Sequence, residues 1–318
     1  MKLLLLVQDE QRVILDRLYE GISHHADAAD VRRLTSAEQA NLKGYVHKHV
    51  DVTKYDRIFT FLRFKKELKQ IRFIRSIPNL VMLEHDACQN YIPSSKYFGE
   101  FSRLYRSIPW VRVIVSGHAL AERLRAEGHD AVFVSKGYDQ ALLSNQNIAR
   151  DIELGFIGSM SSRVYRGRQS FLEKLSGLEP LQIVSTPSGK AYGDALNRIR
   201  FFVSCDMGLG EYMIKNFEAM ACGCVLLAWR QRHGEEEALG FCDMKNVVLY
   251  NSIEELREKL SALRNSPSLA RNIADKGQAL ATARYGYNLL GKQIVEAAKS
   301  PLRNREDYPM SFWRRLFP

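Results

Sequence analysis

Short apolar runs alternate along the chain with longer amphipathic stretches that carry most of the charge. This alternation is typical of buried strands joined by crossover helices in parallel sheets. It predicts two series of strands: Leu3–Val7, Arg57–Phe61, Leu80–Leu83, Val111–Val115 and Ala131–Val134, then Leu154–Ile157, Gln182–Val184, Phe201–Ser204, Val225–Ala228 and Val247–Leu249. We therefore expect an α/β protein with two Rossmann-like, doubly wound parallel sheets.

Apolar residues at helical spacing predict the helices that connect these strands. In the first series, residues 117–128 form a helix with Ser116 as its N-cap and Gly128 as the residue that ends it. In the second series, helices are expected at 170–175, 218–221, 253–263 and 269–283.

Chain length and a polar stretch together predict the domain organisation. The 318 residues exceed the usual size of one hydrophobic core. The polar residues 144–147 place the boundary near residues 138–150. We expect an N-terminal domain at 1–140, a C-terminal domain at 141–295 and a tail at 296–318, with a cleft between the domains.

The tail mixes cations and apolar rings, which suits either packing onto the N-terminal domain or contact with a membrane. Its members are Lys299, Arg303, Arg305, Arg314 and Arg315, with Tyr308, Phe312, Trp313, Leu316 and Phe317.

Cysteine usage and the N-terminus predict a cytoplasmic protein. The apolar run at residues 3–7 stops at Gln8-Asp9-Glu10 without a cleavage site, which favours a strand over a signal peptide. Five cysteines, an odd number, argue against a disulfide framework. Cys222-Gly-Cys224 lacks a second ligand pair at zinc spacing, so no metal site is expected.

The formal net charge of +10 suits diphosphates, an anionic membrane or nucleic acid equally. No helix-turn-helix, RNP or zinc-finger pattern occurs, so no nucleic-acid partner is expected. Residues 61–75 form a basic amphipathic run. As a helix it suits peripheral contact at the inner face of the cytoplasmic membrane, and the alternative is an ordinary sheet-covering helix with a solvated face.

The segment Lys215–Ala228 combines a short helix, a glycine-containing turn and a buried strand. The carboxylate of Glu218 can accept hydrogen bonds from two adjacent hydroxyl groups, such as those of a ribose, while nearby backbone N–H groups face a phosphate. The alternative is a glutamate that only caps the helix.

The letters FEAMACGCVLLA in this segment resemble the Glu-Ala-Met-Ala-x-Gly signature of group 1, family 4 glycosyltransferases, which have the GT-B fold. The resemblance implies that Glu218 contacts the donor ribose. It also implies a glutamate on the donor sugar at position 210, where this chain has glycine followed by Glu211. Glu211 is therefore a candidate catalytic residue, unless the chain follows a related pattern, Arg-x-Phe-Glu-Ala-x-Ala-Cys-Gly, in which Lys215 replaces the function of the arginine.

A second candidate segment begins with the strand at Leu154. This strand ends at Gly158-Ser159, and several arginines follow it. Glycine permits close backbone approach, and guanidinium groups bind diphosphates. The segment resembles the Phe-x-Gly-Ser opening of the family's C-terminal domain. This resemblance implies that Gly158, Ser159, Arg166 and Arg168 hold the donor diphosphate, and the alternative is that the arginines are solvated.

Two further sites follow strand ends, where open α/β sheets bind ligands. Residues 185–192 form a polar loop in which Lys190 would reach a phosphate and Tyr192 would stack on a base, unless this is a plain surface loop. In the N-terminal domain, His85 follows a buried strand. Its resemblance to the family's strand end implies that it orients or activates the acceptor hydroxyl, and the alternative is a hydrogen bond within the fold.

The resemblance implies a glycosyltransferase that moves a sugar from a UDP- or GDP-sugar to a glycan, lipid-linked or lipopolysaccharide-type acceptor, with retained anomeric configuration. No Asp-x-Asp motif occurs, so no cofactor and no metal are expected. The alternatives are a nucleotide-sugar epimerase or hydrolase of the same architecture, a non-catalytic GT-B-like protein and a basic nucleic-acid-binding protein.

Overall fold

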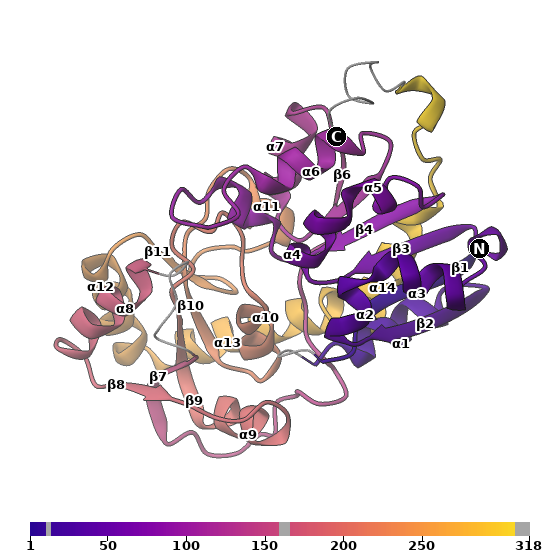
Figure 1. Cartoon of the computed structure of the whole chain (residues 1–318). Coiled ribbons are helices and arrows are strands. Elements are labelled where there is room, and N and C mark those ends of the chain that lie inside the picture. The colour runs from indigo at the N-terminus through magenta and orange to yellow at the C-terminus, as the bar shows by residue number, and fades with distance from the viewer. Residues whose placement is uncertain (11–13, 159–165, 309–318) are drawn as a thin grey trace.

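The computed structural model describes residues 1–10, 14–158 and 166–308, which form two lobes built on parallel sheets (Figure 1). The first sheet has the order β2-β1-β3-β4-β5-β6 and the second has the order β11-β10-β9-β7-β8. Their strands are β1 (Lys2–Gln8), β2 (Ala28–Leu34), β3 (Arg57–Phe61), β4 (Leu80–Glu84), β5 (Arg112–Val115), β6 (Asp130–Phe133), β7 (Ile152–Ile157), β8 (Leu181–Val184), β9 (Ile199–Ser204), β10 (Val225–Trp229) and β11 (Val248–Tyr250). The predicted α/β class with two parallel sheets is confirmed.

Helices cover both faces of each sheet (Figure 1). The first lobe contains α1 (Asp16–His24), α2 (Ser36–Ala40), α3 (Leu42–His49), α4 (Phe64–Glu67), α5 (Ile71–Ile74), α6 (Glu100–Ser107), α7 (His118–Ala126) and the short 3-10 helices η1 (Val52–Lys54), η2 (Leu68–Gln70) and η3 (Ala87–Tyr91). The second lobe contains α8 (Arg166–Ser176), α9 (Lys190–Arg198), α10 (Ile214–Ala221), α11 (Glu235–Leu239), α12 (Ile253–Asn265) and α13 (Pro267–Arg284).

Burial on both faces explains why the strands form unbroken apolar runs in the sequence. Leu3, Leu5 and Val7 of β1 pack with residues of α1 and of α14 (Tyr287–Lys299), whereas Leu4 and Leu6 pack on the opposite face with residues of α6 and α7. β2 was not among the predicted strands because it is a half-buried edge strand that contains Asp30, Arg32 and Arg33.

Three local predictions are wrong. Gly117, not Ser116, is the N-cap of α7, because the Ser116 hydroxyl bonds to the second lobe instead. Residues 61–75 do not form one helix but divide into α4, η2 and α5. The predicted loop at 185–192 ends early, because α9 begins at Lys190.

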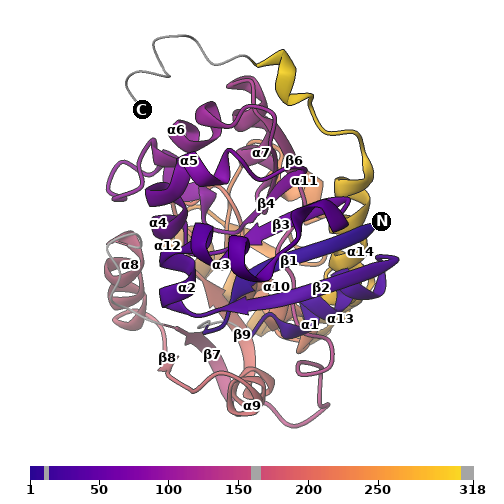
Figure 2. The ribbon, with the colours of Figure 1, turned by 45° about the vertical axis from the view of Figure 1, so that its right-hand side comes forward.

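The end of the chain returns to the first lobe at Tyr287, earlier than the predicted boundary at residue 296 (Figure 2). Two arginines of the first sheet hold the last turn of α14. Arg57 Nε donates to the carbonyl of Ala298 at 2.8 Å, and Arg112 Nη1 donates to that of Ala297 at 2.8 Å.

The described part of the tail continues along the first lobe and includes η5 (Arg305–Asp307). Arg303 donates to the carbonyls of Pro109 and Gly128, and Tyr308 packs against the core of this lobe. The predicted tail residues Phe312, Trp313, Arg314, Arg315, Leu316 and Phe317 lie outside the described residues. None of the described helices has the length and apolarity needed to cross a membrane.

Gly21 of α1 and Gly291 of α14 allow these helices to cross in direct backbone contact. A Cβ atom on Gly291 would lie 2.3 Å from the backbone carbon of Gly21 and 2.5 Å from the nitrogen of Ile22. We expect Gly291→Ala to lower the free energy of unfolding by about 2 kcal/mol, because backbone atoms cannot yield as a side chain does. Urea denaturation followed by circular dichroism measures the change.

The matched control is Gly167→Ala in α8, where the nearest atom is a methionine methyl group at 3.4 Å. Alanine is the better helix former, so this variant is expected to match or exceed the parent in stability. Equal stability of the two variants would contradict the proposed crowding of α1 and α14.

Candidate active site

The carboxyl ends of the two sheets face each other, because loops that follow their strands make contacts across the lobes. Ser116, which follows β5, donates from Oγ to Glu211 Oε2 at 2.6 Å. Lys136 Nζ, beyond β6, lies 2.8 Å from the same oxygen. The backbone N–H of Ala119 in α7 donates to Glu235 Oε2 at 3.0 Å. Glu211 and Glu235 of the second lobe therefore lie at the junction with the first lobe.

Glu218 and Tyr192 come together in the second lobe, from α10 and α9. The Tyr192 hydroxyl donates to Glu218 Oε2 at 2.6 Å. Burial raises the pKa of Glu218 to about 7, although the hydrogen bond from Tyr192 and the charge of Lys215 act in the opposite direction. The structure therefore brings together two of the residues that were predicted to contact the donor, and their roles toward ribose and base stay predictions.

Asp206 organises the start of α10, and sequence analysis missed it. Its carboxylate is buried beyond the end of β9 and accepts hydrogen bonds from four groups. These are the backbone N–H of Met213 at 3.0 Å, Asn216 Nδ2 at 2.7 Å, Ser204 Oγ at 3.2 Å and Arg168 Nη2 at 3.2 Å. An aspartate just past a buried parallel strand is the sequence signal that could have found it.

Lys215 and Gly158 meet at the end of β7. Lys215 Nζ donates to the carbonyl of Ile157 at 2.6 Å, and a Cβ atom on Gly158 would lie 2.1 Å from that nitrogen. Gly158 also has a φ of +155°. This φ favours glycine after the strand, and a side chain at position 158 would also displace the ammonium.

The other predicted diphosphate ligands have different surroundings. Arg168 is buried, and its guanidinium contacts Asp206 and lies 5.7 Å from the ring centre of Phe156. Lys190 is exposed and pairs with Asp194 one turn along α9 at 2.7 Å. Arg166 begins α8, but its side chain and the whole of Ser159 lie outside the described part of the structure.

His85 follows β4 on the first-lobe side of the junction, and its ring lies 5.0 Å from that of Phe61. Burial, together with the charge of Lys136, lowers the pKa of His85 to about 3. The imidazole is therefore neutral at physiological pH and a weak base, which suits a hydrogen bond that orients an acceptor hydroxyl better than removal of its proton.

Glu211 is wholly buried between the lobes. Its Oε2 is bound by Ser116 and Lys136, while its Oε1 has no hydrogen-bond partner among the described residues. Glu235 is buried beside it, and burial raises the pKa of Glu235 to about 8. The carboxylate predicted to touch the donor sugar thus joins the two lobes.

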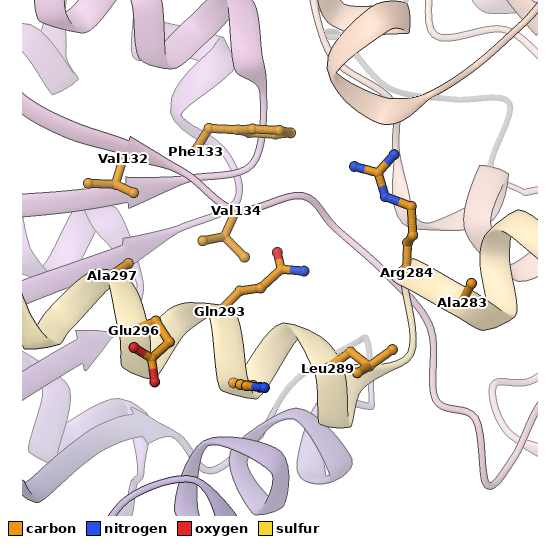
Figure 3. A pocket seen from close by; sticks show the side chains of 10 residues that line it. Val132, Phe133, Val134, Ala283, Arg284, Leu289, Gln293, Glu296 and Ala297 are labelled. Atoms are coloured by element: carbon orange, nitrogen blue, oxygen red, sulfur yellow. The ribbon is translucent and has the colours of Figure 1, made fainter.

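No described cluster of three or more His, Cys, Asp or Glu residues could hold a metal ion. A cavity of about 550 Å³ lies elsewhere, between β6, the end of α13 and α14, where Arg284 and Phe133 extend over it (Figure 3). None of the predicted site residues lines this cavity.

Comparison with known proteins decides the fold. A family model described as glycosyl transferase-like matches residues 166–296. The structure of HepE from Anabaena in complex with UDP-glucose superposes with a TM-score of 0.68 at 16% sequence identity, over 95% of this chain and 100% of that one. The chain has the GT-B fold. The predicted resemblance is confirmed, and the family model confirms the prediction of an enzyme of the glycosyltransferase class.

Two further GT-B structures are similar. Sucrose-phosphate synthase from Thermosynechococcus elongatus has a TM-score of 0.65 at 12% identity, over 93% of this chain and 97% of that one. TarM of S. aureus, in complex with fondaparinux, α-GlcNAc-glycerol and UDP, has a TM-score of 0.59 at 13% identity, over 81% of this chain and 58% of that one. No curated protein matches the chain in sequence.

Proposed function

We propose that this GT-B protein transfers a sugar from a UDP-sugar to a glycan or glycolipid acceptor. The Glu218–Tyr192 pair carries the proposal, since it presents a carboxyl group and a ring at the carboxyl end of the second sheet. UDP is favoured over GDP because HepE and TarM were solved with uridine nucleotides. Lys215, beside Gly158, supplies positive charge for the donor diphosphate without a metal ion.

His85 is the acceptor-side residue of this proposal, because its neutral imidazole stands on the first-lobe side of the junction. Transfer would occur with retention of configuration, as the resemblance to family 4 glycosyltransferases implies. Lys190 points to Asp194 on the outer side of α9 and has no part in the proposed site.

The proposal predicts that the affinity for UDP-glucose depends on pH. With a pKa of about 7, Glu218 is ionised to about 90% at pH 8 and to about 10% at pH 6. Hydrogen bonds from the ribose hydroxyls to the ionised carboxylate are stronger than those to the neutral carboxyl group. We therefore expect the affinity to be present above pH 7 and to fall about tenfold between pH 8 and pH 6, as measured by calorimetry.

UDP-glucose is the suitable probe, because its diphosphate is esterified at both ends and does not titrate in this range. The variant Glu218→Gln is the control, since it cannot change its charge and is expected to bind equally weakly at both pH values. A pH dependence that persists in this variant would assign the titration to another group, such as Glu235. Failure of the parent protein to bind any uridine nucleotide would refute the proposed donor.

We place the acceptor at an anionic membrane surface because a group of neighbouring elements in the first lobe is rich in cations. The group consists of α3, α4, η2 and α5, which contact one another through the rings of His47 and Phe73 and through Gln70, whose side chain accepts from the N–H of Leu42. Its cations are Lys43, Lys48, Lys65, Lys66, Lys69 and Arg72.

None of these six cations forms an ion pair within the part of the chain that the structure describes. Some surface cations of the second lobe, such as Arg198, Arg257 and Lys259, are paired with carboxylates. Unpaired positive charge in one group of elements attracts anionic headgroups. This arrangement supports an enzyme located in the cytoplasm at the inner face of the membrane, in polysaccharide or lipopolysaccharide synthesis.

We expect the double variant Lys65→Gln/Lys69→Gln to bind vesicles of phosphatidylglycerol and phosphatidylcholine about 30-fold more weakly than the parent. Vesicle sedimentation at low salt measures the change. The matched control, Lys276→Gln/Lys292→Gln, removes two exposed lysines from α13 and α14. An equal loss of binding in both double variants would indicate nonspecific attraction by net charge.

A further inference from the structure

Lys136 is a buried lysine whose ammonium lies where the two lobes meet. Its side chain is 3% exposed, and that of Glu211, its partner 2.8 Å away, is 0% exposed. Burying two charges costs several kcal/mol per ion unless each is paired, so such a pair needs a specific reason to exist. Coulombic attraction from Glu211 overcomes the effect of burial and raises the pKa of Lys136. The ammonium therefore remains charged.

The contact between Lys136 and Glu211 joins segments that are far apart in the sequence and closely packed in the structure. Ser116 donates to the same carboxylate oxygen at 2.6 Å. A Cβ atom on Gly117 would lie 2.9 Å from Glu211 Cβ. The Glu211 carboxylate is therefore bound by Ser116, which follows β5, and by Lys136, which lies beyond β6. Glu211 also packs closely against Gly117, next to Ser116.

Lys136 faces titratable groups of both lobes. On the first lobe, its charge helps to lower the pKa of His85 and acts on Asp86 and Cys88. On the second lobe, it acts on Glu211 and Glu235. Burial and this cation together keep the imidazole of the acceptor side neutral, and the same cation holds a carboxylate of the donor side.

Glu211 belongs to the segment that connects β9 to α10, the helix that carries Lys215 and Glu218. The start of α10 has its own support, because Asp206 binds the N–H of Met213 and the side chain of Asn216. The helix therefore keeps its place in the second lobe without Lys136. Lys136 and Ser116 instead fix the position of the connecting segment relative to His85. Through this segment they fix the position of the whole donor side.

We propose that Lys136, assisted by Ser116, is a positioning residue of the transfer reaction, which fixes the donor-side segment around Glu211 against the acceptor side of the first lobe. The inference rests on the proposed function and adds to it a residue of the first lobe that acts on turnover through Glu211. Binding of UDP, which depends on Glu218 and Tyr192, does not need this contact.

The test compares Lys136→Met with Lys276→Met, the same change at an exposed position of α13. UDP affinity is measured by calorimetry, and turnover of UDP-glucose is measured by release of UDP, with the purified full chain. We expect both variants to bind UDP within twofold of the parent. Turnover (kcat) is expected to fall about 100-fold in Lys136→Met and to be unchanged in Lys276→Met. Ser116→Ala is expected to show a smaller fall, again in kcat and not in UDP affinity.

A second variant separates positioning from folding. Lys136→Met leaves the charge of Glu211 buried without a partner and can destabilise the protein. Lys136→Met/Glu211→Gln removes both charges and is expected to recover the thermal midpoint while turnover stays low. Turnover of this folded double variant within threefold of the parent would overturn the inference. If the parent binds UDP but turns over no UDP-glucose, the proposed function fails, and the positioning role fails with it.

Discussion

Replacement of Glu218 by alanine is expected to weaken UDP binding about 100-fold. The carboxylate lies within reach of Tyr192 and would accept two hydroxyl hydrogen bonds from the ribose. Hydrogen bonds to a charged group contribute about 1.5–3 kcal/mol each, so the lower end of this range for two bonds corresponds to about two orders of magnitude in affinity. Calorimetric titration with UDP at pH 8, where the carboxyl group is mostly ionised, gives the dissociation constant.

Two controls make this result specific to the ribose. Glu254→Ala changes an exposed glutamate of α12 and is expected to leave UDP affinity unchanged. Tyr192→Phe removes one hydrogen bond to Glu218 but keeps the ring, so a much smaller loss of affinity is expected. Unaltered UDP binding by Glu218→Ala would show that this glutamate only supports the helix.

Replacement of Asp206 by alanine is expected to lower the free energy of unfolding by about 3–5 kcal/mol. Arg168, which is buried, would lose the carboxylate that it contacts at 3.2 Å, and removal of one member of a buried ion pair is costly. The N–H of Met213 and the amide of Asn216 would also lose their hydrogen bonds to this carboxylate. Urea denaturation followed by circular dichroism gives the midpoint.

The matched control is Asp151→Ala, which breaks the exposed ion pair with Arg198. Exposed pairs contribute little, so no measurable change in the midpoint is expected. The UDP affinity of Asp206→Ala should fall as well, since α10 carries Glu218. If Asp206→Ala unfolds at the same urea midpoint as the parent, Asp206 does not organise the start of α10.

The structural elements that depend on residues close together in the chain could be predicted from the sequence. Ten of the eleven strands in the described part of the chain were predicted from short apolar runs, and the helix that contains Glu218 was predicted from its own residues. β2 was missed because an edge strand carries charges on its open positions. The start of α9 was missed because Ser185, Thr186, Pro187 and Gly189 are turn formers that conceal a helix beginning at the next residue.

The site was predictable only within each lobe. Tyr192 and Glu218 were both candidates, and the structure brings them together. Glu211 was considered from its distance to Glu218, but no spacing could show that it meets Ser116, 95 positions away in the chain. Lys136 has no motif that separates it from other lysines. Contacts between the lobes depend on how the two folded sheets pack against each other. The local sequence pattern does not contain this information.

The return of the chain at α14 affects how the protein is made. The first lobe is discontinuous in sequence, and the second lobe is inserted between β6 and α14. During synthesis, the face of the first sheet that carries Leu3, Leu5 and Val7 stays uncovered until Ile294 and Val295 have left the ribosome. The inserted lobe has all of its strands by then, so it is able to fold first. A chain that ends before α14 would expose an apolar sheet face and aggregate.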